Sequence, residues 1–174
     1  LMVVFWKMWV IYVRSRFFHK QEYILLEIRL PRDILKAPLA MEAVFSGLHH
    51  GAGETTFIDR YWLGKVRPWF SFEIVSLNGE LHLYVWTRKF FKDIVEAQIY
   101  AQYPEVEIYE VSDYTQGVFF DVEKTSVWGC DFRLTKPDPY PIKTYVDYGL
   151  DKDPKEEQKI DPISSMFEFL GNIK

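Results

Sequence analysis

The sequence predicts an α+β fold, a ferredoxin-like β-α-β-β-α-β sandwich, from a central stretch in which strand and helix patterns alternate. Residues 69–75 (WFSFEIV) and 81–86 (LHLYVW) alternate apolar and polar side chains, as half-buried strands do. Asn78-Gly79 between them is a strong signal for a tight hairpin turn, because both positions tolerate positive φ. A helical run at 88–103 is followed by a last strand at 106–111.

The first strand and helix of this order lie in residues 22–50. EYILLEIRL (22–30) predicts a strand, which Pro31 ends because proline has no N–H for the ladder. Pro38 suits a first helical turn, and the helix is expected to run to about His49. Its buried stripe is expected to be Leu39 or Met41, Val44, Phe45 and Leu48.

The hairpin pattern assigns side chains to the two faces of the sheet. Six apolar residues are expected beneath the helices: Phe70, Phe72, Ile74, Leu81, Leu83 and Val85. Thr87 is expected to cap the second helix, and Pro104 to stop it. The inward residues of that helix are expected to be Phe91, Ile94, Val95 and Gln98 or Ile99. The open face is the candidate partner-contact face, with Tyr23, Glu27, Glu73, His82, Tyr84, Trp86 and Tyr109.

This partner-contact face admits two kinds of partner. RNA-recognition modules share the strand order and stack bases on aromatic residues, and Tyr84 and Trp86 are available for stacking. The glycines and the basic residue of that module's third strand are missing here. Glu27, Glu73 and Glu107 would also repel phosphates, whereas each stacked base contributes only about 1–3 kcal/mol. A protein partner is therefore favoured.

Residues 22–113 are thus expected to form the ferredoxin-like domain, and residues 114–174 an extended connector and an incomplete second α+β domain. VFFDV (118–122) predicts a short strand and SVWGCDFRL (126–134) a stronger one, in which Cys130 is interpreted as buried filler. Asp161-Pro162 is expected to start a helix. One face of that helix would carry Ile163, Met166, Phe167 and Leu170.

Residues 1–18 are predicted to be a membrane-anchor helix, the C-terminal part of a transmembrane helix. LMVVFWKMWVIYV (1–13) is apolar apart from one lysine, but it spans only about 20 Å, and a bilayer core needs about 20 residues. The candidate anchor residues are Trp6, Trp9, Tyr12, Arg14 and Arg16. A signal peptide is disfavoured because the charges follow the apolar run. A helix that covers another subunit or the domain itself is the remaining alternative.

Charge is unevenly distributed along the chain. The net charge is −4, yet the first 20 residues contain Lys7, Arg14, Arg16 and Lys20 and no acid, so the remainder carries −8. An acidic body binds phosphate backbones poorly. Basic residues directly after the apolar run place the folded domain on the cytoplasmic side of the cell membrane. The single Cys130 agrees with that compartment and excludes an internal disulfide framework.

Two loops carry residues of chemical interest. The segment from His49 to Asp59 contains adjacent histidines, but HExxH spacing and the lysine of a phosphate-binding loop are absent, so no metal or catalytic site is predicted. The candidate basic-aromatic loop contains Arg60, Trp62, Lys65 and Arg67. Packing on its own domain is favoured for this loop, ahead of a protein contact and of single-stranded nucleic acid.

Four long runs carry a family resemblance: RYWLGKVRPWFSFEIVS, EAQIYAQYPEVEIYEV, LTKPDPYPIKTYVDYGLDKDPKEE and DPISSMFEFLG. They resemble an uncharacterised membrane-anchored family of candidate-phylum bacteria with reduced genomes. The resemblance implies an N-terminal hydrophobic segment, a longer cytoplasmic portion that continues past Lys174, and no assigned function or catalytic residues. It also implies an association with conjugation or type IV secretion-like machinery.

The leading hypothesis is a non-enzymatic, membrane-anchored adaptor that faces the cytoplasm. It would assemble through protein contacts or as a homo-oligomer, with an envelope or secretion-type complex as a candidate setting. Membrane lipid is the second expected partner, and no cofactor or small-molecule substrate is inferred. The alternative is a single-stranded nucleic-acid-handling module that accompanies a translocation ATPase.

Overall fold

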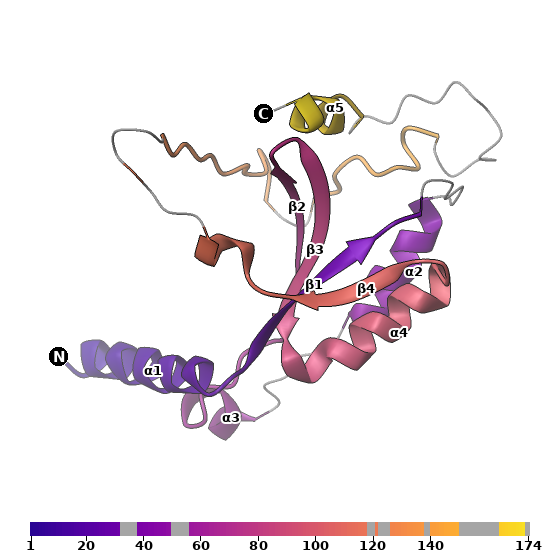
Figure 1. Cartoon of the computed structure of the whole chain (residues 1–174). Coiled ribbons are helices and arrows are strands. Elements are labelled where there is room, and N and C mark those ends of the chain that lie inside the picture. Colours follow the sequence, from indigo (N-terminus) through magenta and orange to yellow (C-terminus); the bar gives the residue numbers. More distant parts are fainter. Residues whose placement is uncertain are drawn as a thin grey trace.

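The computed structural model describes residues 1–31, 38–49, 56–117, 121, 126–137, 140–149 and 164–172. It is a mixed α+β structure around one four-stranded antiparallel sheet with the strand order β2-β3-β1-β4 (Figure 1). The strands are β1 (Tyr23–Arg29), β2 (Ser71–Leu77), β3 (Glu80–Arg88) and β4 (Glu107–Val111). The predicted α+β class and the four predicted strands are confirmed.

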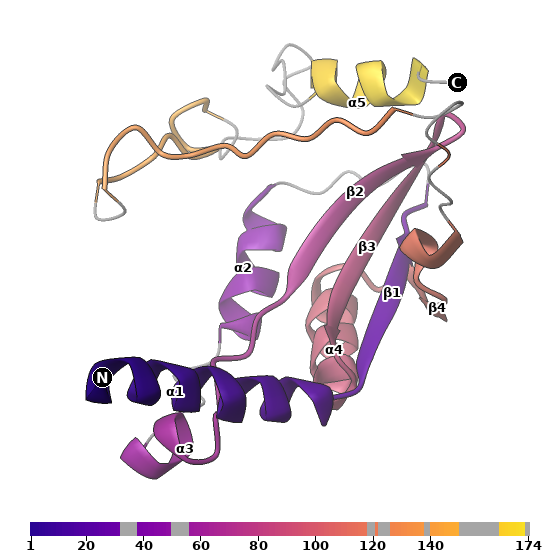
Figure 2. The same cartoon turned by 90° about the vertical axis from the view of Figure 1, so that its left-hand side faces the viewer.

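Helices α2 (Pro38–Leu48) and α4 (Lys92–Gln102) lie on the same face of the sheet (Figure 2). Their inward residues and the alternate residues of β1 and β3 form the core, in which Leu26, Val44, Val85 and Val95 are fully buried. The predicted turn between β2 and β3 is confirmed, because Asn78 and Gly79 have φ values of 53° and 86°.

The helices cover less of the sheet than the sequence pattern suggests. The β2–β3 hairpin extends beyond them (Figure 2), so Phe72, Ile74 and Leu81 stay about 40% exposed. Phe45 of α2 reaches Phe72 with ring centroids 4.9 Å apart, and both rings remain partly exposed. The prediction that these residues are buried beneath helices is therefore wrong for Phe72, Ile74 and Leu81.

Thr87 does not cap the second helix, which corrects another prediction. It lies within β3 with its side chain fully buried, and its hydroxyl has no hydrogen-bond partner among the described residues. The chain instead enters α4 through the short 3-10 helix η1 (Lys89–Phe91). The strand continues two residues further than expected, so Thr87, five residues before α4, pairs with Ile24 in the ladder.

Beyond β4, the chain forms the 3-10 helix η2 (Tyr114–Gly117) and later α5 (Ser164–Asn172). The residues predicted as a strand at 126–134 pair with no strand in the described structure, and Trp128 and Phe132 are 84% and 97% exposed. Cys130 is exposed, so its predicted burial is wrong. The predicted strand at 118–122 and the start of the helix at Asp161-Pro162 lie outside the described residues, apart from Asp121.

Two helices lie at the end of the sheet opposite to α5 (Figures 1 and 2). They are α1 (Met2–His19) and the short α3 (Phe57–Tyr61). No helix in the described part of the chain is both long and apolar enough to cross a bilayer. The expected transmembrane helix is therefore not found, because the 18 residues of α1 include Lys7, Arg14 and Arg16.

Candidate functional site

The first candidate surface is the exposed apolar part of α1, α3 and the turn that follows α3. Its members are each more than half exposed: Met2, Val3, Val4, Phe5, Met8, Ile11, Tyr12, Phe57, Ile58, Trp62 and Leu63. We call this set the α1–α3 surface. Contiguous apolar patches of this kind are rare on soluble monomers and usually mark contacts with proteins or membranes.

Aromatic packing holds α3 against α1. The ring of Trp6 lies 5.4 Å from that of Tyr61 and 6.1 Å from that of Trp62, measured between centroids. Trp9 Nε1 donates a hydrogen bond of 2.9 Å to the carbonyl oxygen of Tyr61. Each of the two tryptophans on α1 is consequently only 40% exposed, so α3 shields one side of the helix and leaves the rest open.

Two local features fix this contact. Thr56 caps α3, since its hydroxyl accepts a hydrogen bond of 3.1 Å from the Asp59 N–H. Gly64 has a φ of +68°, and a Cβ there would overlap the Val13 carbonyl and lie 2.8 Å from the Arg14 nitrogen. The turn therefore needs glycine both for its left-handed backbone and for its close approach to α1.

The structure explains the basic-aromatic loop by these contacts. Trp62 packs on Trp6 and Trp9, and Lys65 forms an ion pair of 2.7 Å with Asp59. Arg67 is exposed beside Phe45 and Phe72. The loop thus packs on its own chain, the alternative favoured by the sequence. Trp62 and Lys65 lie beside α1, whereas Arg67 lies beside α2 and β2, so the four candidate residues do not form one site.

Basic side chains border the α1–α3 surface without acidic partners. Residues 2–19 of α1 contain Lys7, Arg14 and Arg16 and no acid, and Lys20 follows the helix. Among the described residues, none of these four takes part in an ion pair. The surface therefore combines apolar area with uncompensated positive charge.

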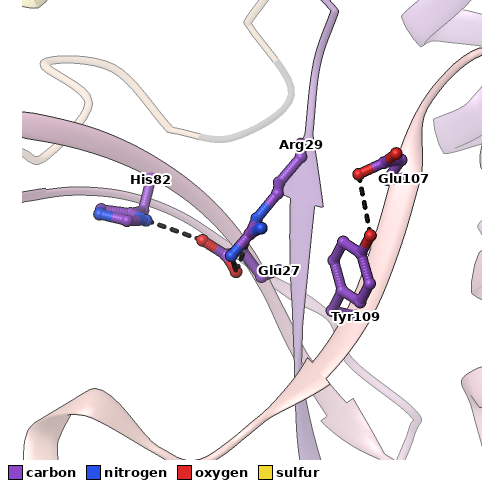
Figure 3. Close-up of polar contacts among 5 residues, drawn as sticks. All are labelled: Glu27, Arg29, His82, Glu107 and Tyr109. Atoms are coloured by element: carbon purple, nitrogen blue, oxygen red, sulfur yellow. Dashed lines mark hydrogen bonds and ion pairs between the residues drawn. The ribbon is translucent and has the colours of Figure 1, made fainter.

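The second candidate surface is the partner-contact face of the sheet, and its centre is a buried polar cluster (Figure 3). Glu27 is only 5% exposed. One carboxylate oxygen lies 2.8 Å from His82 Nδ1, and the other accepts hydrogen bonds from Arg29 Nε and Nη2 at 3.2 and 2.9 Å. The hydrogen bond from His82 is the main cause that lowers the pKa of Glu27, with a further contribution from Arg29, against burial that raises it.

An aromatic cover lies beside this cluster. Tyr114 of η2 stacks on Tyr84 with centroids 5.3 Å apart, and Tyr84 is 6% exposed. The Tyr114 hydroxyl donates a hydrogen bond of 3.0 Å to Glu73, which also accepts one of 2.9 Å from Ser71. Burial is the main cause that raises the pKa of Tyr114 to about 12, and the Glu73 carboxylate adds to it.

The two ends of the partner-contact face are also occupied. Tyr23 stacks on Trp86 at 4.4 Å, and Trp69 leans on both rings and on Phe18 of α1. At the β4 edge, Tyr109 donates a hydrogen bond of 2.9 Å to Glu107 (Figure 3). The Arg29 guanidinium lies 4.9 Å from the Tyr109 ring centroid.

These contacts change the interpretation of the partner-contact face. Its carboxylates are largely satisfied within the chain, and Tyr84 is covered, so much of the face is already occupied by the protein itself. The strand pattern of the sheet does not predict this cover, because Tyr114 comes from beyond β4. A local signal existed: Asp113 accepts a hydrogen bond of 2.9 Å from the Thr115 N–H, a turn that aspartate favours.

The described residues contain no group of three or more histidine, cysteine, aspartate or glutamate side chains that could hold a metal ion. His49 is exposed at the end of α2, whereas His50 and Glu54 lie outside the described residues.

Comparison with known proteins gives one match. The sequence model of a family described as "Domain of unknown function (DUF8128)" matches residues 16–160. No curated protein and no solved structure matches the chain significantly.

Proposed function

The chain belongs to the family described as a domain of unknown function (DUF8128), and from its exposed surfaces we propose that it is a membrane-surface adaptor. In this proposal the α1–α3 surface lies in the headgroup region of a cell membrane, on the cytoplasmic side. The sheet domain then stands away from the lipid and binds a protein partner. The strand order, with α2 and α4 in the two crossovers, supports a ferredoxin-like topology for that domain.

The observation that carries the proposal is the combination of apolar exposure and unpaired positive charge on α1. Interfacial helices bury apolar side chains about 5–10 Å into the boundary between headgroups and acyl chains. Each nearby lysine or arginine adds about 1 kcal/mol of attraction to an anionic leaflet. Trp6 and Trp9 are partly exposed and suit the interface, where aromatic residues concentrate. The cytoplasmic leaflet carries the anionic lipids that this charge would select.

A flotation assay tests the proposal with vesicles that contain phosphatidylglycerol and phosphatidylcholine. We expect the full chain to float with these vesicles and Phe5→Glu to lose at least about tenfold in affinity, because burying one such side chain contributes about 1.5–3 kcal/mol. Phe90→Glu is the matched control, since Phe90 is 82% exposed but lies outside the α1–α3 surface. If the full chain stays unbound, or both variants lose affinity equally, the proposal is wrong.

The protein-binding half of the adaptor rests on a different segment. Val127, Trp128 and Phe132 are 80–97% exposed, and aromatic side chains such as those of Trp128 and Phe132 are enriched at protein interfaces. A pull-down that uses the full chain and the Trp128→Ser variant as baits tests this half. Light scattering of each protein then measures its oligomeric state. A monomer that recovers no partner with either protein would count against it.

The nucleic-acid alternative receives less support from the geometry. Tyr84, one of its two stacking residues, is covered by Tyr114 and 6% exposed. Trp86 is likewise stacked on Tyr23. A base would have to displace side chains that already pack on both rings.

A further inference from the structure

A recess lies between α1 and the turn after α3, next to the α1–α3 surface. Its volume is about 560 Å³. Its lining includes Trp9, Tyr12, Arg16, Lys20, Trp62 and Lys65. No acidic residue lines it, so the recess gathers three cations and four aromatic rings, the fourth being that of Phe17, without a negative charge in its wall.

The charges of the recess are only partly compensated. Lys65 has a partner, Asp59, at 2.7 Å. Arg16 and Lys20 take part in no ion pair with any described residue.

Sequence spacing brings the two uncompensated cations together. Arg16 lies in the last turn of α1, and Lys20 follows four residues later, at the C-cap of the helix. Residues four apart lie on one face of a helix, so both can approach one anion. A guanidinium matches the geometry of a phosphate with two parallel hydrogen bonds, and an ammonium adds a compact charge.

We propose that this recess binds the phosphate of an anionic lipid headgroup. The inference rests on the proposed function and deepens it, because it assigns the headgroup to one site. A lipid is chosen over a soluble phosphate ester because Trp9 and Trp62 line both the recess and the edge of the exposed apolar surface. A headgroup in the recess therefore leaves its acyl chains beside Met8, Tyr12 and Leu63.

The test uses the full chain and a soluble probe, short-chain dihexanoyl phosphatidylglycerol below its micelle concentration. Binding is followed by the NMR shifts of the indole N–H groups of Trp9 and Trp62. We expect saturable shifts with this probe, at least about tenfold weaker binding for Arg16→Gln and for Lys20→Gln, and no shifts with dihexanoyl phosphatidylcholine. Lys7→Gln, which removes the same charge from α1 outside the recess, should keep the affinity within about twofold.

Several outcomes would overturn the inference. One is an equal loss for Lys7→Gln and Arg16→Gln, which indicates diffuse attraction. Another is equal affinity for glycerol 1-phosphate, which indicates a site for soluble phosphate esters. If the full chain floats with anionic vesicles but the soluble probe causes no NMR shifts, the headgroup site is ruled out and the proposed function stands. If the soluble probe causes saturable NMR shifts but the full chain does not float with anionic vesicles, the site is supported and the proposed function is contradicted.

Discussion

Glu27 illustrates, at the scale of single residues, how this protein accommodates a carboxylate on the central strand of its sheet. The side chain is 5% exposed and would be costly to bury alone. His82 from β3 and Arg29 from the same strand each donate to one of its oxygens. Arg29 shares this face of β1 by strand alternation, whereas the contact with His82 cannot be inferred from local spacing, because the register between β1 and β3 sets that distance.

The substitution Glu27→Gln should lower the free energy of unfolding by about 1–3 kcal/mol at pH 7, since it removes charge-assisted hydrogen bonds. The pKa of Glu27 in the folded chain lies below its usual value of 4.5. The unfolded chain therefore takes up this proton first, so the stabilisation is present at neutral pH and is lost as the pH falls below about 4.5.

Urea unfolding at pH 7 and at pH 3.5 measures this effect of Glu27→Gln. The difference from the unmodified chain should shrink at the lower pH. Glu107→Gln is the control, because Glu107 is exposed at the edge strand and should change stability little. An equal loss of stability for Glu27→Gln at both pH values would contradict the assigned role of the carboxylate.

Tyr114→Phe removes the hydroxyl that donates to Glu73 and keeps the ring on Tyr84. We expect a loss of about 1 kcal/mol at pH 7. Because the folded pKa of Tyr114 is raised to about 12, its contribution is complete below pH 10 and is lost as the pH rises through 12. An absorbance titration should lose one late-titrating tyrosine in this variant, whereas Tyr140→Phe, at an exposed tyrosine, should keep it.

At the scale of elements, the strands and helices follow from local patterns. Alternation locates β1, β2, β3 and β4 to within two residues, and Asn78-Gly79 fixes the turn. The errors concern contacts between elements. The sequence does not show that α2 and α4 stop short of the hairpin tip, that η2 folds back on Tyr84, or that α3 packs on α1. Tyr84 and Tyr114 are 30 positions apart and Trp9 and Tyr61 are 52 apart, separations over which a local pattern carries no signal.

The contact between α1 and α3 can be tested at Gly64. Gly64→Ala forces a side chain into a left-handed backbone position and against the backbone of α1. Gly149→Ala is a matched control, because Gly149 has the same φ of +68° and nothing within 4 Å of its added Cβ.

We expect both variants to pay the left-handed penalty of about 1–2 kcal/mol. Only Gly64→Ala should in addition loosen α3, which near-ultraviolet circular dichroism of the tryptophans and hydrogen exchange at Phe57–Tyr61 would report. The amides of β1 and β3 should stay protected, since Gly64 contacts α1 and not the sheet core. Identical spectra for the two variants would show that the approach of Gly64 to α1 is not required.

At the scale of the whole molecule, charge and apolar exposure are segregated. The first 20 residues carry four of the basic side chains and no acid, and the remaining chain carries a net charge of −8. The α1–α3 surface lies at one end of the sheet, and α5 lies at the other (Figure 2). An anionic surface therefore attracts one end of the molecule and repels the rest, which orients the sheet domain away from the lipid.

Salt should separate the two contributions to binding. The Debye length falls from about 10 Å at 0.1 M to about 3 Å at 1 M, so the attraction of Lys7, Arg14, Arg16 and Lys20 to anionic vesicles is screened. Burial of Phe5 and Met8 is not screened, and excluded salts leave it intact. We expect affinity for phosphatidylglycerol vesicles to fall by at least about tenfold over this range without vanishing, and the residual binding to be lost in Phe5→Glu. Affinity for pure phosphatidylcholine vesicles should be weak and should not fall with added salt, because these vesicles carry no net charge whose attraction salt could screen. Anionic binding that is indifferent to salt would mean that the basic residues of α1 do not face the lipid.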